Sequence, residues 1–573
     1  MAHARRDFVL IVVKTQTPQA RKIRGVMASA RSTGAQRLAS AGAALLERAR
    51  RSATRGRCLL LAAVCAALVS GCATPPLDVA RQASYATALA QDTLLGRAFA
   101  ARFPASGSES GVRLLVSGVE AFVTRAALAE AAQRTLDLQY YVVAEDATAT
   151  LLLYRAMLAA QRGVRVRLLL DDISATGRDF DLATLAAHPN VQLRVFNPFL
   201  QRGPLGISRL FEFMGDSERL NRRMHNKLWI ADNSAAVIGG RNLGDAYFAA
   251  SGEVDFADLD VLAAGPVVAQ ASRSFDEYWN SEWALPIAAF VDEPPARAQW
   301  DALLSALAAG AARFRDTEYA QALRSAELGR DVRAGNVALV AARAWVVYDA
   351  PGKLDKAGAQ GPGRIFAALR PLVEAAQSEV IMVTPYFVPS GRGIELLCGL
   401  VQRGVSVKLL TNSLASTDVP AVHSGYARYR PRLLACGVQM HELRPSVTPA
   451  GHKRSGLSSG ASLHAKAIAV DRRSVVVGSM NLDPRSRLSN TEVAVFIESA
   501  QIGSQLGAMF QEATAPDQAY RVELSEPGNA AAPLVWLGRE DDKPVRHTDE
   551  PGASWWRRMI VDLFDAFAPE ELL

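Results

Sequence analysis

Residues 225–232 read HNKLWIAD, and residues 464–471 read HAKAIAVD. The segments that follow them also match, because IGGRNL at 238–243 corresponds to VGSMNL at 477–482. Further upstream, QRGVRVRLL at 161–169 corresponds to QRGVSVKLL at 402–410. The offset between the paired segments is 239 to 241 residues throughout. A nearly constant offset across separate segments indicates that the chain contains two copies of one structural unit.

Each copy alternates strand-like and helix-like segments. In the first copy these are LDLQYYVV (136–143), LLLYRAMLAAQRG (151–163) and VRVRLLLDD (164–172), and in the second EVIMVTPYFV (379–388), GIELLCGLVQRG (393–404) and VSVKLLTN (405–412). This alternation predicts an α/β fold with a mixed or largely parallel sheet and helices on both faces. We expect a first lobe over 72–340, a second over 341–535 and a tail over 536–573.

Charge is distributed unevenly along the chain. The 573 residues carry a formal charge of +7, but residues 1–71 alone carry +11, so the remainder carries −4. The basic character therefore belongs to an N-terminal leader, and the body has no polycationic excess for a nucleic-acid backbone. With 49% hydrophobic and 21% charged residues, the composition is that of a folded protein and excludes a disordered or collagen-like chain.

The leader ends in an apolar run, CLLLAAVCAALVSG at 58–71, which arginines precede. Its length is typical of a signal peptide and too short for a transmembrane helix. The run is followed by Cys72, and Val69-Ser70-Gly71-Cys72 resembles a bacterial lipobox, in which the cysteine is lipidated. A non-cleaved anchor or a buried apolar helix is the alternative. Cys398 and Cys436 lie in apolar, helix-like segments, and we expect them to be buried free thiols.

The repeated motif is His-x-Lys-x4-Asp. His225 and Lys227, like His464 and Lys466, stand two positions apart and therefore project from one face of a strand. Asp232 and Asp471 fall at the following turn, where we expect them to fix a hairpin rather than touch substrate. Two histidines and two lysines that converge would form an anion site without a metal. One imidazole can then attack phosphorus while the other protonates the leaving oxygen.

The strand after each motif ends in small and amide residues. We expect the glycines there to let a phosphate approach the backbone, and Asn242, Asn481 and Ser479 to donate hydrogen bonds to it. Arg222 and Arg223 precede the first motif and are either headgroup-phosphate ligands or solvated. Tyr140-Tyr141 and Tyr386-Phe387 end matched strands, where they line a lipid pocket or belong to the core.

The doubled motif resembles the phospholipase D superfamily, and HNKLWIAD-NSAAVIGGRNLGDAYF and HSGYARYRPRLLACGV resemble its bacterial cardiolipin synthase C branch. The resemblance covers about residues 100–573. It implies two duplicated α/β/α lobes, related by a pseudo-twofold axis, with one shared active site at their interface, a phosphohistidine intermediate and no cofactor. It also implies that a downstream acid orients each histidine: Glu492 for His464, and Asp258, rather than Asp260, for His225. The alternative for Asp258 is a salt-bridging strand residue.

The resemblance further implies a phosphatidyltransferase that makes cardiolipin from phosphatidylglycerol and a second phospholipid. His225 is then the nucleophile and His464 the general acid and base, although the order can be reversed. The alternatives are a phospholipase D that releases phosphatidic acid and a periplasmic nuclease, and the −4 body disfavours the latter. We expect no nucleic-acid partner and a lipid-anchored protein of the bacterial envelope facing the periplasm, with the outer membrane favoured.

The tail SWWRRMIVDLFDAFAPEELL has apolar residues at helical spacing. It predicts an amphipathic helix that either docks on the body or inserts at a bilayer interface, as a second membrane contact beside the lipid anchor.

Overall fold

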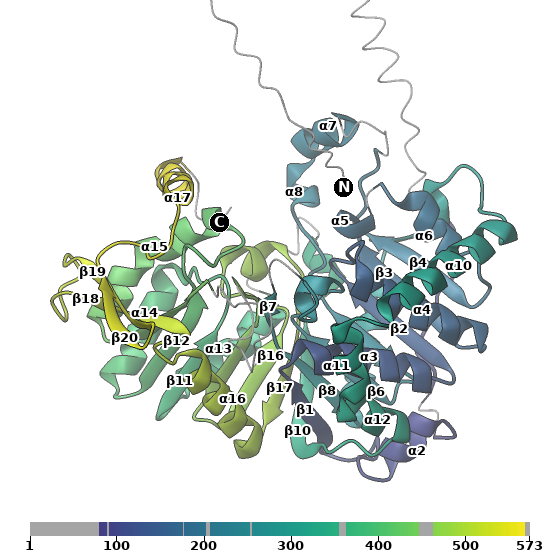
Figure 1. Cartoon of the computed structure of the whole chain (residues 1–573), viewed down its shortest axis with the longest axis horizontal. Helices are drawn as coiled ribbons and strands as arrows, with labels where there is room; N and C mark the ends of the chain where they lie inside the picture. The colour runs from purple at the N-terminus through teal and green to yellow at the C-terminus, as the bar shows by residue number, and fades with distance from the viewer. Residues whose placement is uncertain are drawn as a thin grey trace, which may run out of the picture. The chain divides into compact units, whose positions relative to one another are not determined.

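The computed structural model describes residues 79–567 except 89–90, 176, 202–206, 252–254, 355–362 and 446–461. The leader and Cys72 lie outside these residues. Among the described residues, no helix combines the length and the apolar character needed to cross a bilayer. Figure 1 shows the two lobes, coloured along the chain.

The first lobe is built on one mixed sheet. Its strands, in spatial order, are β1 (Ser110–Leu115), β8 (Asp260–Ala264), β6 (Ala235–Gly239), β5 (Leu228–Ala231), β2 (Thr135–Tyr140), β3 (Arg165–Asp171), β4 (Val191–Phe196) and β9 (Ala284–Pro286). Strands β2, β3 and β4 are parallel, and the others pair antiparallel. The helices of this lobe are α2 (Leu94–Ala100), α3 (Gly118–Ala131), α4 (Ala147–Gln161), α5 (Asp172–Ala175), α6 (Asp179–Leu185), α7 (Ile207–Gly215), α8 (Ser217–Leu220), α9 (Pro266–Trp279), α10 (Arg297–Phe314), α11 (Glu318–Ser325) and α12 (Glu327–Ala334).

The second lobe repeats this strand order. Its sheet consists of β10 (Val340–Tyr348), β17 (Val493–Glu498), β16 (Ser474–Gly478), β15 (Ala467–Val470), β11 (Glu379–Val383), β12 (Ser406–Asn412), β13 (Gln439–Leu443), β18 (Ala519–Leu524), β19 (Leu534–Glu540) and β20 (Lys543–His547). The helices are α13 (Arg364–Glu374), α14 (Ser390–Gln402), α15 (Pro420–Ala435), α16 (Ala500–Ala513) and α17 (Trp555–Phe567). The predicted duplicated α/β fold is confirmed, since each strand of the first sheet has a counterpart at the same place in the second.

The hydrophobic core consists of three buried clusters, one within each lobe and one shared between the lobes. One lies under α3 and α4 in the first lobe, and another under α13, α14 and α15 in the second. The third contains residues of both lobes, including Phe275 of α9 and Phe510 of α16. Because β1 also pairs with β10 across the lobes, the interface is a continuous apolar core, in which each lobe holds its half of the site in place.

The two motif aspartates act at the hairpins, as predicted. Asp232 accepts hydrogen bonds from the backbone N–H groups of residues 133–135, which lead into β2. Asp471 does the same for residues 377–379, which lead into β11. Both aspartates have a backbone φ of 51°, the left-handed conformation that a tight hairpin requires. Each aspartate therefore ties its hairpin to the start of the neighbouring strand, far from any substrate.

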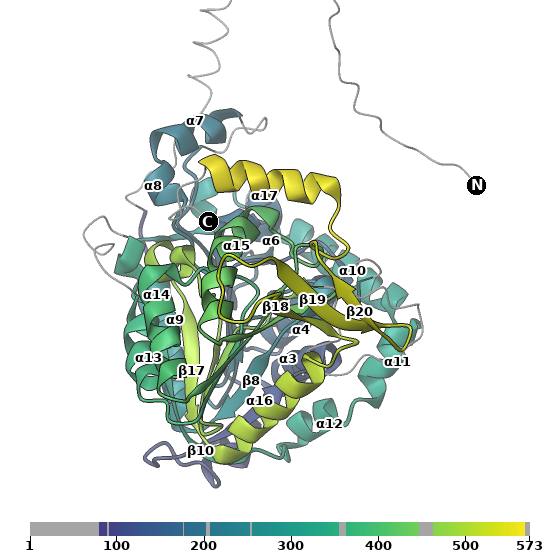
Figure 2. The same cartoon turned by 90° about the vertical axis from the view of Figure 1, so that its left-hand side faces the viewer.

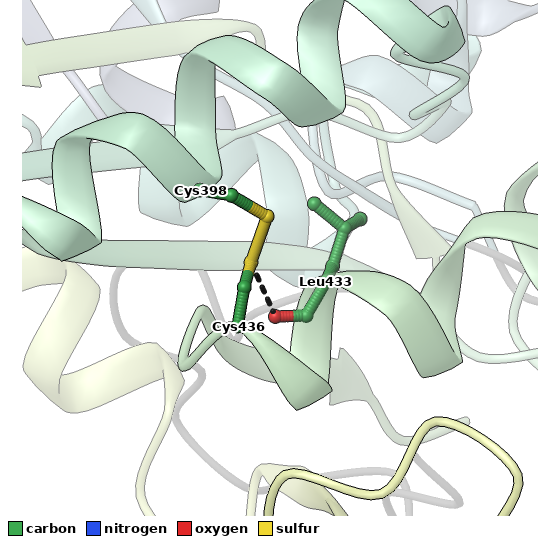
Figure 3. Close-up of a disulfide and its surroundings, with 3 residues drawn as sticks. All are labelled: Cys398, Leu433 and Cys436. Atoms are coloured by element: carbon green, nitrogen blue, oxygen red, sulfur yellow. Dashed lines mark hydrogen bonds between the residues drawn. A yellow bond between two sulfur atoms is a disulfide. The ribbon is translucent and has the colours of Figure 1, made fainter.

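The prediction for the cysteines is wrong. Cys398 on α14 and Cys436, just after α15, form a disulfide across a Cα–Cα distance of 5.5 Å (Figure 3). They are also half-buried rather than buried. The two helices pack on the same face of the sheet, and this tertiary contact brings together cysteines whose positions along the chain say nothing about pairing.

Candidate active site

The two motifs meet between the lobes through matched backbone contacts. The N–H of His225 donates to the carbonyl of Thr491 at 2.8 Å, and the N–H of His464 donates to the carbonyl of Ala257, also at 2.8 Å. Strand β14 (Ser462–Leu463) runs parallel to β7 (Phe256–Ala257) beside the second of these contacts. Each histidine therefore enters the site paired with the acid-bearing segment of the other lobe.

The carboxylates consequently cross between the lobes. His225 Nδ1 lies 2.9 Å from Glu492 Oε2, and His464 Nδ1 lies 2.6 Å from Asp258 Oδ2. Glu492 and Asp258 each contact a motif histidine, as expected of acids that orient the rings, but the expected pairing within each copy is wrong. Asp260, the rejected candidate, binds Arg125 and Arg241 instead. The physical reason for the exchange is the short interlobe backbone pairing, which places each acid opposite the other lobe's histidine.

The carboxylate contacts define the state of both imidazoles. A carboxylate only accepts hydrogen bonds, so Nδ1 of each ring carries the proton and Nε2 keeps its lone pair. Burial lowers the pKa of His225 to about 4, although Glu492 acts in the opposite direction. Burial and then Lys466 lower the pKa of His464. Both rings are therefore neutral near pH 7, as a nucleophile requires.

The acids stay ionised beside them. Burial acts to raise the pKa of Glu492 and of Asp258, but the adjacent imidazole and lysine together outweigh it and the pKa of each is lowered. Ser479 donates a hydrogen bond from its hydroxyl to Glu492, and Ser486 donates another at 2.7 Å. The expectation that Ser479 binds phosphate is thus wrong, since its hydroxyl faces β17 and holds the carboxylate that orients His225.

Each motif lysine contacts the histidine two residues before it. Lys227 Nζ donates to the carbonyl of His225 at 2.6 Å and lies 5.4 Å from the centroid of the Tyr141 ring. Lys466 Nζ donates to the carbonyl of His464 and lies 2.9 Å from its Nδ1. Burial lowers the pKa of Lys466 to about 8 and lowers the pKa of Lys227 well below its usual value. An anion between the lobes would favour the charged form of both and bind to it.

The two asparagines, Asn242 and Asn481, differ in whether their amide groups are already hydrogen-bonded. Asn242 uses its amide oxygen to accept from the N–H of Val142 and its amide nitrogen to donate to the Tyr247 hydroxyl, at 3.2 and 2.9 Å. Asn481 Oδ1 is buried and has no hydrogen-bond partner among the described residues. Of the two amide oxygens, that of Asn481 thus lacks a partner among the described residues, whereas that of Asn242 is already bonded to the backbone.

The small residues at the strand ends have a different role from the predicted one. A Cβ at Gly240 would lie 2.2 Å from Asp258 Oδ1, and one at Gly478 would lie 2.3 Å from the carbonyl oxygen of Val493. These glycines therefore make room for the neighbouring segments that carry Asp258 and Glu492, not for a phosphate approaching the backbone.

The arginine pair is structural. Arg222 is buried and binds the carbonyl of Leu354 and the carboxylate of Glu218, at 2.7 and 2.6 Å. Arg223 is buried against Asp171 at 3.2 Å. The solvated alternative is wrong for both arginines, because both side chains are buried and hold the segment that leads into the motif.

Aromatic side chains enclose the imidazoles. Tyr141 meets the His225 ring edge-on with the centroids 5.0 Å apart, and Tyr247 meets the His464 ring in the same way at 5.2 Å. Tyr140 and Phe387, in contrast, belong to the core. Tyr247 was missed from the sequence because it lies in a 3-10 helix of three residues, Asp245–Tyr247, which no strand or helix pattern marks. Tyr386 donates to Asp418 at 2.8 Å.

A cluster of three or more side chains able to hold a metal ion is absent from the parts of the chain that the structure covers. The site instead offers two neutral imidazoles, each fixed by a carboxylate, and two ammonium groups. This arrangement can bind a phosphodiester, attack it with one imidazole and protonate its leaving oxygen with the other.

Comparison with known proteins identifies relatives. The family described as "Cardiolipin synthase, PLD-like domain" matches residues 126–279 and again residues 369–514. The chain is 36% identical over 475 residues to cardiolipin synthase C of Escherichia coli K12, covering 81% of this chain and 96% of that one. It is 24% identical over 442 residues to cardiolipin synthase A of Edwardsiella ictaluri, covering 77% and 71%.

Among solved structures, phosphatidylserine synthase of Haemophilus influenzae Rd KW20 aligns with a TM-score of 0.49 and 12% identity, over 80% of this chain and 93% of that one.

Proposed function

The chain belongs to the cardiolipin synthase family of phospholipase D-like enzymes, which makes it a phosphatidyltransferase, and we propose that it forms cardiolipin from phosphatidylglycerol and a second phospholipid. The observation that carries the proposal is the pair of histidine–carboxylate contacts that cross between the lobes inside one enclosed site. Each contact orients one imidazole through its Nδ1. A reaction with two successive displacements needs two such imidazoles, one to attack phosphorus and one to move the proton.

In the first displacement, Nε2 of His225 attacks the phosphorus of the donor lipid. The bond from phosphorus to the headgroup alcohol breaks, and His464 gives that oxygen a proton. His464 is neutral at rest, but the negative charge of a bound phosphodiester favours its protonated form. The products of this half-reaction are a phosphatidyl-His225 intermediate and a free alcohol. Lys227 and Lys466 neutralise the phosphate oxygens throughout.

In the second displacement, His464 is neutral again and takes the proton of the acceptor hydroxyl as that oxygen attacks phosphorus. The bond between phosphorus and Nε2 of His225 breaks, which restores the enzyme. The unpartnered Oδ1 of Asn481 is an acceptor that a substrate hydroxyl can satisfy. Transfer to an alcohol outpaces hydrolysis only if the site positions the hydroxyl and limits water, and the buried, aromatic-edged imidazoles support this.

The product distribution tests the proposal. Vesicles of phosphatidylglycerol, with and without phosphatidylethanolamine, are expected to yield cardiolipin in excess of phosphatidic acid. The alcohol released, glycerol or ethanolamine, identifies the donor. Phosphatidic acid as the main product in every mixture would reassign the enzyme as a hydrolase, and cleavage of DNA with inert vesicles would reassign it as a nuclease. The His225→Asn/His464→Asn double variant sets the background.

The lipid anchor and the envelope location are part of the same proposal. The sequence around Cys72 supports lipidation, and the Cys398–Cys436 disulfide supports an oxidising compartment such as the periplasm. The absence of an acid at Ala73, after the cysteine, favours the outer membrane.

A labelling experiment tests the anchor. In cells fed a radioactive or clickable fatty acid, the wild-type chain is expected to incorporate label, and Cys72→Ala is expected to lose it and to accumulate the unprocessed form. Cys65→Ala, inside the apolar run, is the matched control and should be labelled normally. Equal labelling of the Cys72→Ala chain would disprove lipidation at this residue.

A further inference from the structure

Helix α17 is attached to the second lobe by polar contacts. The Arg557 guanidinium donates to the carbonyls of Leu414 and Thr417, at 3.0 and 2.6 Å, and Asp565 pairs with Arg428 on α15. The apolar residues of the helix face outward: Trp555 and Trp556 are 63% and 55% exposed, and Met559, Leu563 and Phe564 are also exposed. The helix therefore contacts the body, one of the two alternatives expected from the sequence, but its apolar side stays uncovered in the described structure.

Other exposed apolar side chains lie on segments of both lobes. Ile173 is on α5 and Phe180 on α6, both after β3, and Phe213 and Met214 are on α7, after β4. Val419 lies between β12 and α15. All of these segments follow the carboxyl ends of parallel strands. Among the described residues, the one large exposed hydrophobic side chain elsewhere is Tyr85.

The two motif histidines lie at the same edge of the two sheets. His225 precedes β5, which runs antiparallel to β2, and His464 precedes β15, which runs antiparallel to β11. Both histidines thus lie at the carboxyl ends of the parallel strands. Figures 1 and 2 show α7 and α17 on one side of the body in both views, opposite α12 and α16.

We propose that these exposed apolar residues form a docking rim that seats the enzyme on a bilayer, with the two histidines facing the headgroups. We define the docking rim as the outward apolar side chains of α17 together with those of α5, α6, α7 and Val419. The inference rests on the proposed function, because a phosphatidyltransferase must reach the phosphate of lipids that remain in a membrane.

The composition of the rim fits a lipid interface. The stacked indoles of Trp555 and Trp556, 4.1 Å apart between centroids, combine an apolar body with a polar N–H, which favours the headgroup region. Arg558 and Asp562 are exposed on the same helix, so α17 is amphipathic and suited to lie in the interface plane rather than span it. The rim residues come from separate segments of both lobes around the active site. Such a spread of contacts suits a bilayer, which is a broad and deformable partner.

Tryptophan quenching tests the rim independently of catalysis. The full-length protein is reconstituted in vesicles of phosphatidylglycerol and phosphatidylethanolamine that contain brominated phospholipids. Strong quenching is expected from Trp555 and Trp556, since they are the exposed tryptophans of the described residues, whereas Trp283 and Trp345 are half-buried and the other four are buried. Most of it should disappear in Trp555→Ser/Trp556→Ser and persist in Tyr85→Ser, the exposed control on another surface.

Turnover gives the second measurement. Trp555→Ser/Trp556→Ser/Leu563→Ser and, in the other lobe, Ile173→Ser/Met214→Ser are each expected to reduce turnover of vesicle lipid about tenfold, because interfacial binding scales with apolar area. Turnover of monomeric short-chain phosphatidylglycerol should be unchanged. Tyr85→Ser should resemble the wild type in both assays.

The two measurements separate the possible outcomes. Quenching of the wild type without cardiolipin formation would leave the rim intact and reject the proposed function. Equal quenching in wild type and the tryptophan variant, or parallel losses on vesicle and monomeric lipid, would overturn the rim. A wild-type dimer that the α17 variant converts to a monomer, with no quenching, would show that the face binds a second copy instead.

Discussion

Replacing either motif histidine by asparagine is expected to reduce cardiolipin formation by at least about 10²–10⁴-fold, the usual loss when a positioned acid or base is removed. Asparagine is small enough for the site and retains a donor for the carboxylate, but it has no nucleophilic nitrogen and cannot shuttle a proton. The loss is measured as product formed per enzyme on phosphatidylglycerol vesicles. His547→Asn, on β20 and away from the lobe interface, is the control and should behave as the wild type.

The same two variants assign the roles. A short-chain phosphatidyl substrate, quenched rapidly, should leave an acid-labile phosphoramidate on His225, and this label should be absent from His225→Asn. Label that persists in His225→Asn but is lost in His464→Asn would reverse the order of nucleophile and acid. Substantial turnover in both variants would reject histidine catalysis altogether.

Glu492→Gln is expected to reduce turnover by roughly 10²–10⁴-fold, because glutamine cannot hold the Nδ1–H tautomer of His225 as an ionised carboxylate does. The change also predicts the direction of a pH shift. His225 attacks only as the neutral ring, so the rate falls as the pH drops through its pKa of about 4, which Glu492 raises. Removing the charge lowers that pKa further, so the acidic limb of the rate profile should move to lower pH.

Histidine NMR shows which ring responds. In Glu492→Gln the Nδ1–H signal of His225 should change while that of His464 stays in place, and Asp258→Asn should do the reverse. Glu498→Gln, exposed at the end of β17, the strand that follows Glu492, is the matched control. A response of His464 to Glu492→Gln would contradict the crossing of carboxylates between the lobes.

The contacts within each motif were accessible from sequence because they are local or repeated. The aspartates at 232 and 471 occupy turns next to strands with clear patterns, so their role in the hairpins followed from position. The choice of Asp258 over Asp260 followed from the matched distance of Asp258 and Glu492 to the small residues after them. Both inferences depend on neighbours in the chain or on the comparison of two copies.

The contacts that the sequence did not reveal join distant segments. Glu492 is 267 residues from His225, and Asp258 is 206 residues from His464. The Ser479 hydroxyl could donate a hydrogen bond to a phosphate or to a carboxylate. It donates to Glu492 because β17 pairs with β16 and brings that carboxylate close. Arg222 and Arg223 likewise resemble phosphate ligands until the surrounding carboxylates and carbonyls are placed.

By itself, the sequence determined the duplication, the α/β class and the two paired histidines and lysines, because periodicity and repetition can be detected along the chain. The resemblance of the doubled motif to a known superfamily added the family and the two acids expected to orient the rings. Only the tertiary structure decided which acid meets which histidine, that Cys398 and Cys436 are bridged, and that α17 docks with its apolar side outward. These outcomes depend on how two lobes and their helices pack. Packing depends on surfaces that are assembled from residues far apart in the chain. A local sequence pattern therefore cannot predict it.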